Sequence, residues 1–114
     1  MKRVMVVDDE AVITTQLEDR LQFMKYDVVG TASSAEESVR MARELCPDLI
    51  LMDIVMKGKL DGIDAAMKIK DSLDIPIIFL TAYADDRYIK RAMQAEPFGY
   101  IVKPFREDDI RANI

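Results

Sequence analysis

The sequence contains no histidine and a single cysteine, Cys46. The lack of histidine removes the side chain that most often serves as a general base or a metal ligand near neutral pH. One cysteine cannot form an internal disulfide, so we expect a reducing compartment and a Cys46 that is a small apolar residue near a helix end. No apolar run approaches the length of a membrane span, and the first residues are typical of a strand and not of a signal peptide. We therefore expect a cytoplasmic protein.

Positive charge is also in short supply, with 16 basic against 21 acidic residues and a formal net charge of −5. This balance argues against nonspecific binding of nucleic acid or of an anionic membrane by this domain. The 114 residues suffice for one hydrophobic core. We expect a single domain over 1–114 that belongs to a longer chain or is cut within its last helix, because the apolar spacing of Ile110 and Ile114 has no stop signal after it.

Five short apolar runs alternate with amphipathic stretches along the chain. The runs cover 2–7, 26–31, 47–56, 75–80 and 98–102. Strict alternation of strand and helix predicts an α/β fold, an open parallel sheet with helices on both faces and right-handed crossovers. We expect five strands in the order 2-1-3-4-5 and five helices, of which the last is truncated.

The spacing of apolar residues predicts which helix faces point inward. The expected inward residues are Ile13, Leu17, Leu21 and Met24; Ala35, Val39, Ala42 and Leu45; Ile63, Ala66, Met67 and Leu73; Ile89, Ala92 and Met93. Most of the eight methionines are expected to fill gaps in the core. Ser33 or Ser34 is expected to cap the second helix in a capping box, and Asp85 to cap the fourth.

Asp53 is the one carboxylate near the end of the most apolar run, 47–56. An ionised aspartate among such residues costs several kcal/mol unless it is paired. Apolar residues and not a helix start follow it, so a capping role does not explain it. We therefore expect Asp53 to emerge into a cleft with cations nearby.

Other polar residues also fall where predicted strands end. Asp8 and Asp9 follow the first strand, Thr81 follows the fourth and Lys103 follows the fifth. In an open α/β sheet these ends form one rim, and the order 2-1-3-4-5 makes strands one and three neighbours there. Three converging carboxylates repel one another, and a hard divalent cation such as Mg²⁺ resolves the conflict. With a lysine and a hydroxyl nearby, such a site suits phosphoryl transfer.

Four motifs lie in order along nearly the whole chain. They are Val6-Val7-Asp8-Asp9-Glu10, Leu51-Met52-Asp53, Leu80-Thr81-Ala82 and Tyr100-Ile101-Val102-Lys103-Pro104-Phe105. The chain resembles the receiver domains of two-component response regulators, the family that includes the chemotaxis response regulator. The resemblance implies a flavodoxin-like, doubly wound fold and a phosphorelay switch that is a regulatory phospho-acceptor and not a classical enzyme.

By this resemblance, Asp53 accepts a phosphoryl group from a phosphohistidine of a sensor kinase or phosphotransfer protein. Mg²⁺ or Mn²⁺ would be held by Asp9, Asp53 and the backbone carbonyl of Val55, with Asp8 acting largely through water. Lys103 would pair with the phosphoryl group.

The resemblance also gives roles to neighbouring residues. Thr81 would hydrogen-bond to the phosphoryl group, and the Lys103-Pro104 peptide would be cis. Tyr100 would turn inward on phosphorylation, remodelling the face of helix four, strand five and helix five, through which a homodimer could form.

Two features are specific to this chain. The loop after the acceptor, 56–62, lacks the proline usual in the family and is one residue longer, which bears on loop rigidity and kinase docking. Tyr83, two residues past Thr81, is bulky enough to shield an acyl phosphate from water. We predict slow self-dephosphorylation, and faster loss of phosphate in Tyr83→Ala.

Simpler interpretations stand beside these. Asp8, Asp9 and Glu10 could serve simply to cap the first helix. Thr81 could make a local hydrogen bond in a turn, and Lys103 and Tyr100 could be ordinary strand residues. Other classes are a pseudo-receiver that is not phosphorylated, the receiver part of a hybrid sensor kinase, a flavodoxin-like cofactor binder and an aspartyl-phosphate hydrolase. A cofactor binder needs a phosphate-cradling loop after strand one, and the hydrolase needs Asp-x-Asp there; the sequence has neither.

Overall fold

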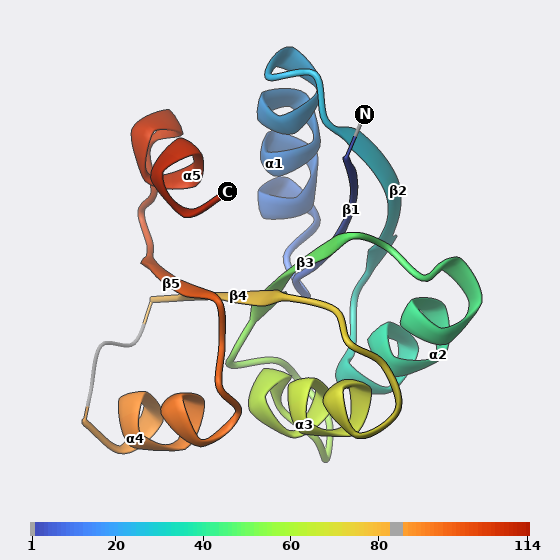
Figure 1. The fold of residues 1–114 in the computed structure, drawn as a ribbon. Helices are drawn as coiled ribbons and strands as arrows, with labels where there is room; N and C mark the ends of the chain where they lie inside the picture. Colours follow the sequence, from blue (N-terminus) through green and yellow to red (C-terminus); the bar gives the residue numbers. More distant parts are fainter. Residues whose placement is uncertain (1, 83–85) are drawn as a thin grey trace.

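The computed structural model describes residues 2–82 and 86–114, which form one layered α/β unit (Figure 1). Its elements, in chain order, are β1 (Arg3–Val7), α1 (Ala11–Phe23), β2 (Asp27–Ala32), α2 (Ala35–Leu45), β3 (Leu49–Asp53), α3 (Gly62–Ser72), β4 (Ile77–Thr81), α4 (Asp86–Gln94), β5 (Gly99–Val102) and α5 (Glu107–Asn113). The strands pair in parallel in the order β2-β1-β3-β4-β5. The predicted architecture is confirmed.

The helices cover both faces of the sheet. Helices α1 and α5 lie on one side, and α2, α3 and α4 lie on the other (Figure 1). Alternate strand residues serve two cores: Met5, Ile50 and Phe79 pack towards α2–α4, while Val6, Leu51 and Leu80 pack towards α1 and α5. Every residue of β3 and β4 is buried, as expected of central strands of a parallel sheet.

The second helix is capped as the sequence suggested, by Ser34. Its hydroxyl accepts a hydrogen bond from the backbone N–H of Glu37 at 3.2 Å. The Glu37 carboxylate accepts one from the backbone N–H of Ser33 at 2.8 Å, so the reciprocal bond of the expected capping box goes to the preceding serine. At the other end Cys46 is the C-cap, in a left-handed conformation, and is exposed and not a packed apolar residue.

Two predicted inward residues were wrong. Met67 in α3 is 36% exposed and Met93 in α4 is 55% exposed. The apolar stripe of α3 runs through Ile63, Ala66 and Ile69, and Met67 lies at its margin. Met93 is one residue past buried Ala92 and therefore about a quarter-turn away from the sheet. Asp85, predicted to cap α4, lies outside the described residues.

Within the described part of the chain, no helix is long and apolar enough to span a membrane. In the short last helix, α5, Ile110 is buried against the core shared with α1. That the domain belongs to a longer chain stays a prediction.

Candidate functional site

Four strands deliver polar residues to one edge of the sheet. Asp53 is the last residue of β3 and Thr81 the last of β4, one position later than predicted. The register pairs Asp53 with Leu80 and Thr81 with Val102, so the carboxyl ends of β3, β4 and β5 are level. Asp8 and Asp9 directly follow β1, which is hydrogen-bonded to β3. The expected convergence of these residues is therefore present.

Lys103 joins the two inner carboxylates. Its Nζ lies 2.7 Å from Asp8 Oδ2 and 3.5 Å from Asp53 Oδ1. The three side chains are 11%, 0% and 5% exposed, so the ion pairs are shielded from water. The backbone N–H of Lys103 donates to the carbonyl of Thr81 at 2.7 Å, and the Lys103-Pro104 peptide is cis. Lys103 is thus directed into the site and not towards solvent.

The electrostatics of the site single out Asp53. Burial, then the charges of Asp8 and Asp9, raise its pKa to about 7, although the Lys103 ammonium acts in the opposite direction. For Lys103, burial lowers the pKa, but the hydrogen bond to Asp8 and the charge of Asp53 outweigh it and the pKa is raised. A carboxyl group that titrates near neutral pH beside a permanently charged lysine is typical of a reactive site.

An acidic cluster borders this pair. Asp8, Asp9 and Glu10 each offer a carboxylate oxygen, and these oxygens lie within 4.8 Å of one another. The donor set consists of oxygens, which hard divalent cations such as Mg²⁺ prefer. The residues present therefore fit such an ion. Glu10 was not predicted as a member; its only signal was its place next to Asp9.

The acidic residues do not serve mainly to cap α1. Glu10 is the N-cap residue, and in the described structure its side chain makes no capping hydrogen bond. Asp8 instead accepts a hydrogen bond from the Glu10 backbone N–H at 2.9 Å. Asp9 accepts one from the backbone N–H of Lys57 at 3.1 Å, across from the loop after β3. The local geometry orients these carboxylates towards the strand ends.

The β3–α3 loop, which lacks the family proline, is anchored by other means. Met56 is 7% exposed and Leu60 packs against the same core, so apolar side chains hold both halves of the loop. The backbone N–H of Gly62 donates to the Ile54 carbonyl at 2.7 Å. A Cβ at Gly62 would lie 1.9 Å from the Asp53 carbonyl oxygen, so the start of α3 rests directly on the backbone at the end of β3.

The sequence profile of the response regulator receiver domain matches residues 4–114. The chain belongs to this family. The chain is 38% identical over 109 residues to the transcriptional regulatory protein PdtaR of Mycobacterium tuberculosis, covering 96% of this chain and 53% of that protein. It is 41% identical over 115 residues to the probable transcriptional regulator ycf27 of Guillardia theta, covering 99% of this chain and 44% of that protein. The chain therefore spans about half the length of these curated relatives.

A solved structure agrees. The signal receiver domain of a modulated diguanylate cyclase from Desulfovibrio desulfuricans G20 superposes with a TM-score of 0.93 at 35% identity, covering 99% of this chain and 90% of that one. The receiver domain described here thus shares both the sequence pattern and the fold of a two-component family with a regulatory role.

The remaining predicted residues of the receiver lie around the site. Thr81 is fully buried at the end of β4. Tyr100 on β5 is partly buried and packs against the core beneath α2–α4. Val55 is half-buried in the loop after Asp53. Tyr83 lies outside the described residues, so its shielding role stays a prediction.

Proposed function

We propose that this receiver domain is a phosphorylation-dependent switch in which Asp53 accepts a phosphoryl group from a phosphohistidine. Receiver domains of response regulators interact with histidine kinases and phosphotransfer proteins. The observation that carries the proposal is the buried Asp53 carboxyl group, with its pKa raised to about 7, 3.5 Å from Lys103 Nζ. A buried carboxylate in contact with an ammonium is a nucleophile beside a group that can neutralise an incoming phosphoryl oxygen.

The proposed transfer is a single displacement at phosphorus. A carboxylate oxygen of Asp53 forms a bond to phosphorus while the phosphorus–nitrogen bond of the phosphohistidine breaks, and the imidazole keeps the electron pair and takes up a proton. Lys103 would balance the added charge, a role supported by its ion pairs with Asp8 and Asp53. Thr81, which follows the register partner of Asp53 on the neighbouring strand β4, would donate its hydroxyl to the phosphoryl group.

Carboxylates at the ends of β1 and β3 would hold Mg²⁺ or Mn²⁺. We assign the ion to Asp8, Asp9 and Asp53 with the backbone carbonyl of Val55, Asp8 acting largely through water. When bound, a divalent ion neutralises the carboxylates and the phosphoryl oxygens. The hydrogen bond from the Lys57 backbone N–H to Asp9 supports this assignment, because it ties Asp9 to the loop that contains Val55.

The output surface would be the face of α4, β5 and α5. Exposed apolar side chains lie there: Met93 on α4 is 55% exposed, Phe98 before β5 69% and Val102 on β5 46%. We propose that phosphorylation changes this face, through Thr81 and Tyr100, and that a homodimer or another protein partner binds it.

The relatives named above are transcriptional regulators, and the solved neighbour belongs to a diguanylate cyclase. We propose that this receiver likewise controls an output domain within a longer chain.

The deciding experiment is intact-mass measurement after incubation with acetyl phosphate and Mg²⁺. We expect the wild type to gain one phosphoryl group and Asp53→Asn to gain none. Gain in both proteins would place the acceptor elsewhere. Gain in neither would favour a pseudo-receiver that acts by binding alone, although Asp8, Asp9, Asp53 and Lys103 are all retained here.

A further inference from the structure

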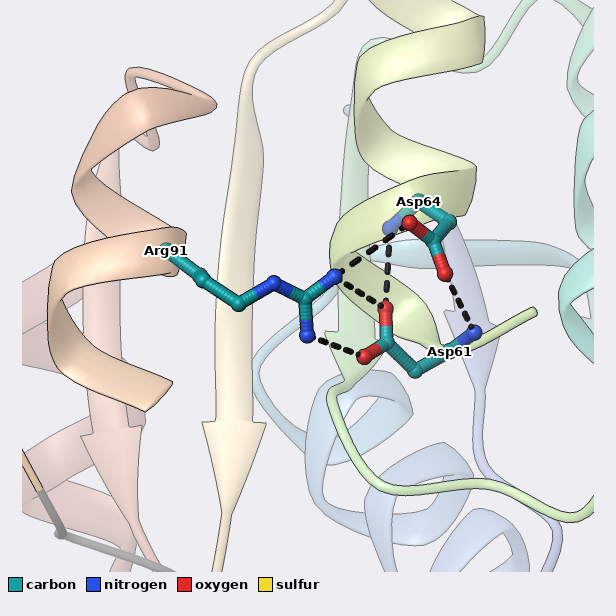
Figure 2. A network of polar contacts seen from close by, with 3 residues as sticks. All are labelled: Asp61, Asp64 and Arg91. Atoms are coloured by element: carbon teal, nitrogen blue, oxygen red, sulfur yellow. Dashed lines mark hydrogen bonds and ion pairs between the residues drawn. The ribbon is translucent and has the colours of Figure 1, made fainter. Parts of the chain in front are cut away.

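Arg91 on α4 connects two helices through an ion-pair network (Figure 2). Its Nη1 lies 2.7 Å from Asp61 Oδ2, and its Nη2 lies 3.5 Å from Asp61 Oδ1 and 3.3 Å from Asp64 Oδ1. The guanidinium thus meets Asp61 with both of its terminal nitrogens, the fork geometry that gives arginine–carboxylate pairs their specificity. We call Arg91, Asp61 and Asp64 the α3–α4 clamp.

The two aspartates of the clamp also begin α3. Asp61 is its N-cap and accepts from the Asp64 backbone N–H at 2.9 Å, while Asp64 accepts from the Asp61 backbone N–H at 3.1 Å. Burial would raise the pKa of Asp61, but hydrogen bonds from Arg91 and from the Asp64 backbone outweigh it, so the pKa is lowered. Because both aspartates are hydrogen-bonded to the backbone at the start of α3, Arg91 is tied to the first turn of that helix.

That first turn is in contact with the phospho-acceptor strand. The backbone N–H of Gly62, one residue after Asp61, bonds to the Ile54 carbonyl at 2.7 Å, and there is no room for a Cβ beside the Asp53 carbonyl. A shift of the Asp53 backbone would therefore move the start of α3, and through Arg91 it would move α4.

Helix α4 contacts the core through few apolar side chains, of which Tyr88 is partly buried. Among its described side chains (87–94), only Ala92 is buried, and an alanine removes little apolar surface from water. Just past the last turn of α4, which contains Arg91, Lys70 of α3 donates to the Glu96 carbonyl. Both polar links to α3 lie at the C-terminal end of α4, where they supplement a small apolar contact, so α4 is an element whose placement a single ion pair can bias.

We propose that Arg91 is a positioning residue that couples the chemical state of Asp53 to the placement of α4, by way of Asp61, Asp64 and the first turn of α3. The proposal rests on phosphorylation of Asp53 as proposed above. Because such coupling is reciprocal, loss of the clamp changes both the order of α4 and its response to the phosphoryl group.

The test is amide hydrogen exchange of α4, read with and without acetyl phosphate and Mg²⁺. Without phosphoryl donor, we expect exchange in α4 to be about fivefold faster in Arg91→Gln than in wild type, the effect of losing a partly exposed bidentate pair. Lys90→Gln is the matched control, since it removes an exposed positive charge from the neighbouring position of the same helix. It is expected to behave as wild type.

With phosphoryl donor, all three proteins are expected to gain one phosphoryl group by intact mass. Exchange in α4 should change in wild type and Lys90→Gln and not in Arg91→Gln. Arg91→Lys should restore only part of the response, because an ammonium cannot bond both Asp61 oxygens as a fork does. Asp61→Asn tests the same ion pair from the other partner, since asparagine can still cap α3 but lacks the negative charge that binds Arg91.

Equal α4 exchange in Arg91→Gln and Lys90→Gln would overturn the clamp, and a full phosphoryl response in Arg91→Gln would overturn the coupling. If Arg91→Gln does not fold, Asp61→Asn is compared with Lys90→Gln in its place, by the same two measurements. If wild type gains no phosphoryl group, the function of Asp53 fails and the coupling with it, whereas the exchange without donor still decides whether the clamp restrains α4.

Discussion

Lys103 Nζ lies closer to Asp8, at 2.7 Å, than to Asp53, at 3.5 Å, although Asp53 is the proposed acceptor. The short bond to Asp8 keeps the ammonium inside the site, while the longer separation leaves an Asp53 oxygen less tightly engaged. Asp8 thus holds Lys103 in the site, and Asp53 is the carboxylate that we propose to react.

The first prediction concerns Asp53→Asn without divalent ions. The folded protein keeps its proton on Asp53 up to about pH 7, whereas the unfolded chain loses it near the ordinary value of 3.8. The free energy of unfolding of wild type, relative to that of Asp53→Asn, is therefore greatest below pH 3.8. It falls between pH 3.8 and about 7, and above about pH 7 it no longer changes with pH. The slope is at most about 1.4 kcal/mol per pH unit.

At pH 8, Asp53→Asn should raise the melting temperature by several degrees, because it removes a buried charge and about 1 kcal/mol of unfolding free energy corresponds to about 4 °C for a domain of this size. Thermal unfolding in EDTA at pH 5 and pH 8 measures both effects. Asp71→Asn, at an exposed carboxylate, is the control and should change little at either pH. A melting temperature for Asp53→Asn that does not exceed wild type at pH 8 would contradict the burial argument.

A second prediction concerns Lys103→Met. Removing the ammonium leaves two buried carboxylates without their cation, which costs about 3 kcal/mol of unfolding free energy. The loss should be larger at pH 8 than at pH 5, since Asp53 can take up a proton at the lower pH. Urea unfolding at the two pH values measures it, with Lys59→Met, at an exposed loop lysine, as the control. An equal loss at both pH values would mean that Asp53 does not depend on Lys103.

Addition of Mg²⁺ should stabilise the folded receiver by mass action. A ligand at about one hundred times its dissociation constant adds about 2.7 kcal/mol. We expect the melting temperature to rise with Mg²⁺ concentration in wild type and Asp71→Asn, and to rise much less in Asp9→Asn and Asp53→Asn. A similar rise in all four proteins would place the ion away from Asp9 and Asp53.

The site was more predictable from the sequence than the helix surfaces. Asp53 and Lys103 stand out because each is a charged residue among apolar neighbours, and strand alternation places their strand ends at one edge. The inward placement of Met67 failed because spacing alone cannot tell the centre of an apolar stripe from its margin. Methionine is apolar enough for the core and flexible enough for the surface.

The clamp had no local signal of this kind. Asp61 and Arg91 are 30 residues apart on different helices. Asp61 has a sufficient local explanation as a helix cap, and Arg91 is one of several basic residues on α4. Only the packing of α4 beside α3 brings them together, and that depends on the sheet order and helix positions jointly.

The last prediction tests the contact between the acceptor strand and α3. In Gly62→Ala, the new Cβ would meet the Asp53 carbonyl oxygen at 1.9 Å, and backbone atoms cannot swing aside as side chains do. We expect a loss of about 3 kcal/mol or more in stability, typical of severe overpacking, together with slower phosphorylation of Asp53. Gly30→Ala is the matched comparison, because its Cβ would meet only the mobile ends of Met41 and Leu45 and should cost less. Urea unfolding and phosphoryl uptake by intact mass measure both effects. If Gly62→Ala proved no more costly than Gly30→Ala and kept normal phosphoryl uptake, the first turn of α3 would not be locked to Asp53, and the route from Asp53 through Arg91 to α4 would lose its first step.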